Sequence, residues 1–410
     1  MGTRSIAPWA NPVQNPQSND HLPPNGIRRR LEIDALRGLM LVWMTLVHLP
    51  TVASRWVNQP FGYASASEGF IFLSALFTGR IYYRLLERDG LWPMSRKLLL
   101  RTLRLYWYHV LLLFFVFAVA ARFAIGGHHP ALYNLLDFYF MAGPARAVSD
   151  SLLLIYRPPL LDIIPLYIIF LLISPMLLIV GRKIPWKFIL GGSFLLWLLA
   201  QFGLRQASYN VLVHYFGLRI PLNEMGAFNL WAWQIVWVMG VWCGMRWARH
   251  DLPVEQWARK TWAPAAVVVA AVLAMRYAEI LGFNTGSWSF LFDKWHLGAI
   301  RIIDFAAIAI LLVRFQAVVK PLAIRPLVML GQASLNVFCA HFFFCFLGLA
   351  MMGEADRLFG WRQAALIAGT FAALLLVGKI SAKNETGGHA DCGVRPTKIQ
   401  TQSGGYIRST

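Results

Sequence analysis

About ten apolar stretches, each close to 20 residues long, run through this 410-residue chain and constrain its fold more than any other feature. A helix that spans a bilayer needs roughly 20 mostly apolar residues. The composition agrees, since 58% of the residues are hydrophobic and only 14% are charged, which excludes a disordered chain and an ordinary soluble enzyme. The expected spans are residues 36–57, 66–86, 104–124, 160–180, 187–204, 229–247, 263–281, 296–314, 327–350 and 363–379.

Basic residues provide an independent test of this helix count, because short cytoplasmic loops collect Lys and Arg. If the N-terminus lies inside, the basic segments near residues 28–30, 88–101, 182–187, 246–260 and 314–325 all fall on the inner side. The net charge of +19 is then an orientation signal rather than a nucleic-acid-binding signal. We expect an all-α polytopic transmembrane bundle of about ten helices with both termini in the cytoplasm.

The two ends of the chain differ from its apolar middle. Residues 1–27 are rich in Pro and Asn and are expected to form a disordered cytoplasmic leader rather than a signal peptide. Residues 381–410, rich in Gly, Thr and Ser, are expected to form a disordered cytoplasmic tail, and residues 28–380 a single transmembrane domain. No P-loop, Rossmann or GxSxG motif occurs, and no Cys or His spacing suggests a metal site.

Ionisable side chains inside apolar helices are costly and suggest a functional site by default. His48 lies roughly 18 Å from the inner end of the first expected helix, at about 1.5 Å per residue. Glu68 begins the next helix, and the short connection makes the two helices antiparallel neighbours. The two side chains are therefore expected to face each other, with the carboxylate fixing the imidazole tautomer. The alternatives are a satisfied core histidine and a carboxylate that interacts with the helix dipole.

Further polar residues are expected at the same outer level, because Asp162 and Gln234 lie near the outer starts of their helices. His341 lies about 14 residues into its helix, which also places it in the outer half. These three are candidate substrate-binding groups.

A second polar group is expected at the inner end of the bundle, where Arg37 opens one helix and Arg101 and Arg104 open another. Arg101 and Arg104 are spaced i, i+3 and share a helix face. Arg suits phosphate geometry, so these residues are candidates for a phosphate-binding cradle. The alternative is ordinary positive-inside anchoring. Two other i, i+3 pairs are expected to form local ion pairs: Arg276 with Glu279, and Arg301 with Asp304.

Several of these motifs together resemble the OpgC family, the glucans biosynthesis proteins C of the membrane acyltransferase superfamily. The resemblance covers roughly residues 28–380, and its N-terminal part is the most specific. Ser74-Ala75 and Ala66-Ser67 depart from the usual family residues. The matching segments are Arg30-Leu-Glu-Ile-Asp34-Ala-Leu-Arg37-Gly38, His48-Leu-Pro50, Phe61-Gly-Tyr-Ala-Ser-Ala-Ser-Glu68-Gly-Phe-Ile-Phe-Leu-Ser74, Pro159-Leu-Leu-Asp162-Ile-Ile-Pro165-Leu-Tyr167, Trp231-Ala-Trp-Gln234 and Leu330-Gly331-Gln-Ala-Ser334-Leu-Asn-Val-Phe338-Cys-Ala-His341.

The resemblance implies an enzyme of the bacterial inner membrane that transfers succinyl groups from a cytoplasmic donor to osmoregulated periplasmic glucans. Its relatives include sugar O-acetyltransferases. The expected fold is a helix bundle around a polar cavity. No bound cofactor or metal is expected; acyl-CoA, with succinyl-CoA favoured, would be a co-substrate, and the carbohydrate and the bilayer the other partners.

The residues fit this chemistry in a specific way. Acyl-CoA phosphates would dock at the inner arginines, and a glycan hydroxyl would enter from the outer side. His48 would accept the hydroxyl proton, Glu68 would orient His48, and Gln234 or Ser334 would stabilise the oxyanion.

Two other classes of protein remain open. A transporter or flippase of an acylated carbohydrate or lipid could use a His/Glu pair as a proton relay, although no matched pair of broken helices is evident. A structural subunit of a glucan-export assembly would tolerate substitution of His48.

Overall fold

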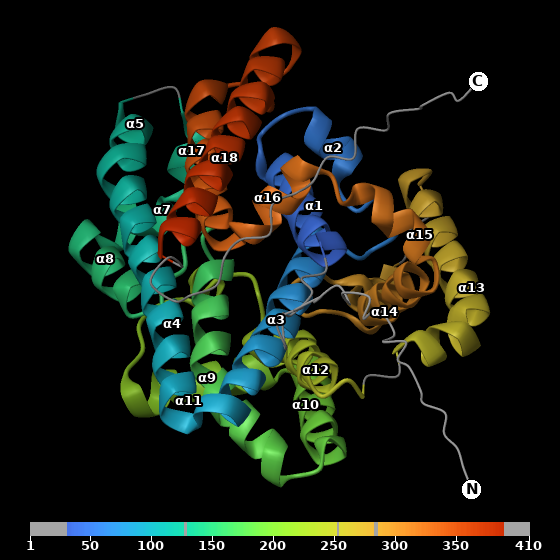
Figure 1. Cartoon of the computed structure of the whole chain (residues 1–410). Coiled ribbons are helices and arrows are strands. Elements are labelled where there is room, and N and C mark those ends of the chain that lie inside the picture. Colours follow the sequence, from blue (N-terminus) through green and yellow to red (C-terminus); the bar gives the residue numbers. More distant parts are fainter. Residues whose placement is uncertain (1–30, 127–128, 252–253, 283–285, 389–410) are drawn as a thin grey trace, which may run out of the picture. The chain divides into compact units, whose positions relative to one another are not determined.

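The computed structural model describes residues 31–126, 129–251, 254–282 and 286–388, and every regular element in these ranges is a helix (Figure 1). The expected leader, residues 1–27, lies outside the described residues, as does the expected tail from residue 389 onward. The first part of that expected tail is helical, because the last helix continues to Gly388.

The N-terminal half of the described chain begins with two long helices joined by a short one. Their bounds, followed by those of the elements up to the middle of the chain, are α1 (Leu31–His48), α2 (Ala53–Val57), α3 (Ala66–Asp89), α4 (Leu91–Phe114), the π-helix η1 (Phe115–Ala120), α5 (Ala121–Ile125), α6 (Pro130–Leu135), α7 (Asp137–Ala142), α8 (Pro144–Leu152), α9 (Ile163–Lys183), α10 (Trp186–Gln201) and α11 (Leu204–Phe216).

The C-terminal half contains longer helices separated by brief breaks. In order, its elements are the 3₁₀ turn η2 (Leu222–Met225), α12 (Leu230–Ala248), α13 (Val254–Ile280), η3 (Gly286–Phe292), α14 (Ala299–Arg314), α15 (Gln316–Val319), η4 (Lys320–Leu322), α16 (Arg325–Gln332), α17 (Ser334–Met352) and α18 (Gly360–Gly388).

The apolar helices identify a multi-pass membrane protein. In the described chain, five helical segments are long and apolar enough to cross a bilayer, and up to seven if each of two bent pairs forms one span. All ten expected segments overlap with helices, although residues 36–57 are divided between α1 and α2 and residues 327–350 between α16 and α17. The helices α1, α3 and α12 are outside the set that could cross a bilayer. The all-helical fold is therefore confirmed, while ten spans and cytoplasmic termini stay predictions.

The central helices pack closely in pairs, and α1 and α3 both contribute side chains to the main hydrophobic core. The most extensive helix pair joins α3 to α12, and the next joins α1 to α16 (Figure 1). Both pairs approach at glycine: a Cβ on Gly244 would lie 2.1 Å from the Leu76 carbonyl oxygen, and one on Gly331 would lie 1.8 Å from that of Asp34. Small residues at such crossings allow the close backbone contact that holds membrane helices together.

Local signals end α1 and begin α3 where the candidate site lies. Pro50 follows soon after His48, and a proline cannot continue the hydrogen-bond ladder of a helix. Ser65 and Glu68 form a capping box at the start of α3.

Candidate active site

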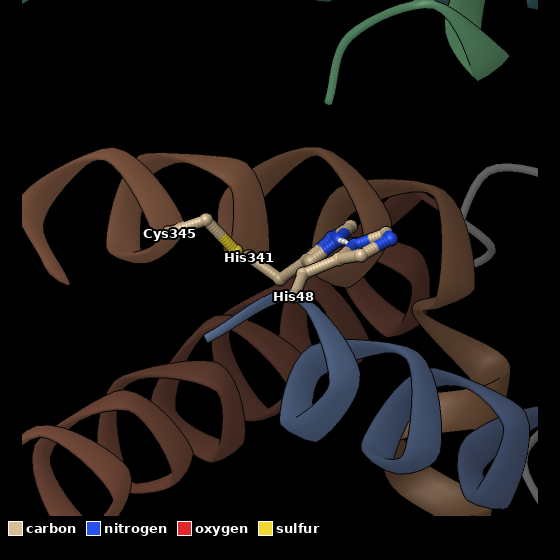
Figure 2. A group of neighbouring side chains, drawn as sticks. All are labelled: His48, His341 and Cys345. Atoms are coloured by element: carbon tan, nitrogen blue, oxygen red, sulfur yellow. Dashed lines mark hydrogen bonds between the residues drawn. The ribbon is translucent and has the colours of Figure 1, made fainter. Parts of the chain in front are cut away.

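His48 and His341 form a direct pair between α1 and α17, a contact that the sequence did not predict. His48 Nδ1 lies 3.1 Å from His341 Nε2, and the two rings are stacked with an interplanar angle of 16°. Figure 2 shows the rings side by side, with Cys345 one turn further along α17. His341 is only 1% exposed, whereas His48, the last residue of α1, keeps partial solvent access.

Glu68 is hydrogen-bonded to Arg301 and Ser65, and it makes no hydrogen bond with His48 among the described residues, so the expected His48–Glu68 hydrogen bond is absent. Arg301, on α14, donates to Glu68 Oε1 through Nε at 2.9 Å and through a terminal nitrogen at 2.5 Å. The backbone N–H and the hydroxyl of Ser65 both donate to Glu68 Oε2. The Glu68 and Arg301 side chains are 0% and 1% exposed. With both oxygens hydrogen-bonded, the carboxylate caps the N-terminus of α3, which agrees with the alternative that it interacts with the helix dipole.

The expected Arg301–Asp304 ion pair is likewise replaced by other contacts. Asp304 Oδ2 accepts hydrogen bonds from the backbone N–H groups of Tyr63 at 2.8 Å and Ala64 at 2.9 Å. These bonds fasten the loop before α3 to α14, while Arg301 reaches past its own helix to Glu68.

The expected Arg276–Glu279 pair on α13 is confirmed, with a separation of 2.9 Å. The Tyr63 hydroxyl donates to the same Glu279 carboxylate at 3.0 Å. Burial, with added contributions from Glu279, raises the pKa of Tyr63 to about 12. The loop before α3 is thus held by two neighbouring helices.

Lys294 is a cation beside this network that sequence analysis missed. It lies in the connection before α14, half-buried, and its ammonium lies 5.1 Å from the centre of the Trp295 ring. Within the described residues, it has no hydrogen-bond or ion-pair partner. Burial lowers the pKa of Lys294, and the nearby negative charges of Glu68 and Asp162 oppose that shift. A half-buried ammonium without a close anion is suited to bind one.

Asp162 and Gln234 are engaged in holding the fold. Asp162 Oδ2 accepts a hydrogen bond from the backbone N–H of Ala227 at 3.1 Å. The Gln234 amide bonds to Ser193 on α10 in both directions, each at 2.7 Å, and donates to the carbonyl of Trp231 at 3.2 Å. Gln234 therefore has no spare donor for an oxyanion in this arrangement.

Arg37 and Ser334 meet near the start of α1, at the end opposite His48. The Arg37 guanidinium donates to the Ser334 hydroxyl, and its centre lies 4.6 Å from the centre of the Phe77 ring. Ser334 begins α17, seven residues before His341, so the two are separated by about 10 Å along the helix. Ser334 therefore lies with Arg37 rather than with His48.

Arg101 and Arg104 have different surroundings on α4. The Arg101 guanidinium is half-buried and donates to the Tyr167 hydroxyl on α9 at 3.0 Å. Arg104 is exposed and, among the described residues, makes no hydrogen bond or ion pair. The structure thus brings Arg101 into the bundle beside a neutral phenol, which leaves its positive charge available to an anion.

The donor atoms of His48, His341 and Cys345 all lie within 4.8 Å of one another, which is close enough for the three side chains to bind one metal ion. Two imidazoles and a thiolate are a donor set that zinc accepts. In the present arrangement, however, the two imidazoles hydrogen-bond to each other, and the Cys345 sulfur has no hydrogen-bond partner in the described chain.

Two cavities lie away from the histidine pair. One of about 380 Å³ lies between α4, α17 and α18, where Tyr108, Asn336 and Cys339 contribute to its wall. Cys339 is two residues from His341, so it points to nearly the opposite side of α17. The other cavity, of about 450 Å³, includes Tyr133 and Glu354 in its lining.

The fold and the site define a multi-pass helical membrane protein with a partly buried histidine pair at one end of α1 and Arg37 toward the other end. The chain belongs to the OpgC family: the family model described as OpgC protein matches residues 29–386. No curated protein and no solved structure matches the chain. Family membership implies a membrane acyltransferase.

Proposed function

We propose that this protein is an O-acyltransferase of the bacterial inner membrane that transfers succinyl from cytoplasmic succinyl-CoA to the hydroxyls of osmoregulated periplasmic glucans or a related carbohydrate. The observation that carries the proposal is the half-buried His48, whose Nδ1 lies 3.1 Å from His341 Nε2 in a chain of the OpgC family. Acyl-CoA acts as a co-substrate, and the reaction needs no bound cofactor or metal.

The proposed step is direct transfer between two bound substrates. The glycan oxygen attacks the thioester carbonyl while His48 takes the hydroxyl proton as general base. The new C–O ester bond forms, the C–S bond breaks, and the proton passes from His48 to the thiolate that leaves as CoA.

The inner arginines support the donor side of this proposal. Arg37 lies eleven residues before His48 on α1, which corresponds to about 16 Å along the helix. Guanidinium groups recognise phosphate through paired hydrogen bonds. With its phosphates at Arg37, Arg101 and Arg104, the CoA would direct its thin pantetheine arm toward His48.

Lys294 favours succinyl over acetyl as the transferred group. A succinyl group differs from acetyl by a terminal carboxylate, and the Lys294 ammonium lacks an anionic partner at hydrogen-bond distance in the described chain. The carboxylate would supply that partner, and a hydrogen bond between charged groups is stronger than one between neutral groups.

The experiment that tests the proposed function is transfer by the purified protein in detergent. Labelled succinyl-CoA and acetyl-CoA are supplied in parallel with periplasmic glucan, and mass spectrometry identifies the product. We expect succinylated glucan and free CoA in equal amounts. A protein that transports acylated carbohydrate without chemistry would release no CoA, so this outcome would replace the proposal with the transporter alternative.

A further inference from the structure

The hydrogen bonds of the histidine pair determine which nitrogen of each ring carries a proton. His341 Nδ1 bonds to the carbonyl oxygen of Phe338, three residues earlier on α17. A carbonyl oxygen can only accept, so His341 Nδ1 is the protonated nitrogen, and a neutral imidazole then has a lone pair on Nε2. His341 is 1% exposed and has no carboxylate partner in the described chain, which favours the neutral ring.

The same logic extends to His48. His341 Nε2 is an acceptor, so His48 Nδ1, 3.1 Å away, must donate to it. His48 then has its lone pair on Nε2, the nitrogen on the opposite side of the ring. A general base needs this lone pair.

We propose that His341 is the positioning residue that holds His48 in the Nδ1–H tautomer, through a relay that runs from the Phe338 carbonyl through His341 to His48. The proposal rests on the proposed acyl transfer, in which the Nε2 atom of His48 accepts the hydroxyl proton. His341 performs with a neutral ring the task that a carboxylate performs in a Ser-His-Asp triad. A neutral acceptor avoids placing an additional charge inside the bundle, where an isolated carboxylate would be costly.

Two amide substitutions at position 341 separate this role from simple packing. The side chain of His341→Gln extends as far as Nε2, so its oxygen can accept from His48 Nδ1. The shorter side chain of His341→Asn can still donate to Phe338 but cannot reach His48. We expect His341→Gln to stay within about tenfold of the native kcat, and His341→Asn to lose about 100-fold or more with KM for succinyl-CoA little changed. Equal activities for the two variants would overturn the relay.

A spectroscopic measurement on the native protein tests the relay without using activity. With ¹⁵N-labelled histidine, we expect His48 to show a protonated Nδ1 and an unprotonated Nε2, and the same tautomer for His341. The opposite tautomer at either ring overturns the proposal even if transfer is observed. If transfer is absent while both tautomers are as expected, the relay stands and the proposed function fails.

Cys345→Ala distinguishes the relay from a metal site formed by the same three side chains. The sulfur has no hydrogen-bond partner in the described chain, so we expect this variant to keep native activity and tautomers. Stoichiometric zinc in the purified protein, lost together with activity in Cys345→Ala, would overturn the relay, because a metal would occupy the nitrogen that the relay requires to be protonated.

Discussion

Two polar pairs join distant parts of this chain, and they are built in opposite ways. Glu68 and Arg301 carry full charges, are almost completely inaccessible, and every carboxylate oxygen has a partner. His48 and His341, which we propose are both neutral, are hydrogen-bonded to each other, and His48 is only half-buried. A pair whose polar atoms are all hydrogen-bonded and buried is suited to hold helices together, whereas the half-buried His48 has a second ring nitrogen outside the pair that can exchange a proton with a substrate. The comparison is the reason why our proposal assigns the catalytic role to His48 with His341 rather than to the expected His48–Glu68 pair.

The largest effect should come from removing the reactive ring of the neutral pair. In His48→Ala we expect kcat for succinyl transfer to fall about 100- to 10,000-fold, because the general base is lost. Thermal unfolding in detergent should change little, since His48 is at the end of α1 and only half-buried. A variant that folds normally and transfers succinyl at the native rate would contradict the assignment.

A substitution in the charged pair of Glu68 and Arg301 should lower the stability of the protein. In Glu68→Gln, the buried Arg301 guanidinium loses its counter-charge, and breaking a buried pair in this way typically costs about 3–5 kcal/mol. We expect a large fall in the unfolding temperature in detergent. The matched control is Arg182→Ala, which removes an exposed pair with Glu87 and should cost less than about 1 kcal/mol. Similar losses in the two variants would show that Glu68–Arg301 is not a special contact.

The inner arginines should control donor affinity. In Arg101→Ala we expect the Kd for succinyl-CoA to rise roughly 10- to 100-fold, since a hydrogen bond to a charged group contributes about 1.5–3 kcal/mol. Binding can be measured by calorimetry, with Arg182→Ala as a control for loss of positive charge elsewhere. If both variants bind equally well, Arg101 is only a positive-inside residue.

The smallest expected effect is on the preference for succinyl over acetyl, and it depends on Lys294. In Lys294→Gln we expect the ratio of succinyl to acetyl transfer to fall about tenfold, because only the succinyl carboxylate loses a partner. Acetyl transfer should stay near its native rate and serves as the internal control. An unchanged ratio would remove Lys294 from substrate recognition.

Several features of the site could be predicted from sequence because they depend on local patterns. The polar residues His48, Glu68 and His341 stand out against apolar helices, and the i, i+3 spacing of Arg276 and Glu279 correctly predicted their ion pair. The same spacing rule failed for Arg301 and Asp304. A spacing identifies which side chains are able to meet, but not which partner from another helix competes for them.

The sequence by itself determined that this is an all-helical membrane protein of the OpgC family. The length of its apolar segments and the motifs of the family depend only on the order of the residues. Only the tertiary structure decided the partners of the buried polar groups. Arg301 lies 233 positions from Glu68, and His341 lies 293 positions from His48. Contacts over such separations depend on how α1, α3, α14 and α17 pack, and a buried charge or ring takes the partner that this packing brings within hydrogen-bond distance.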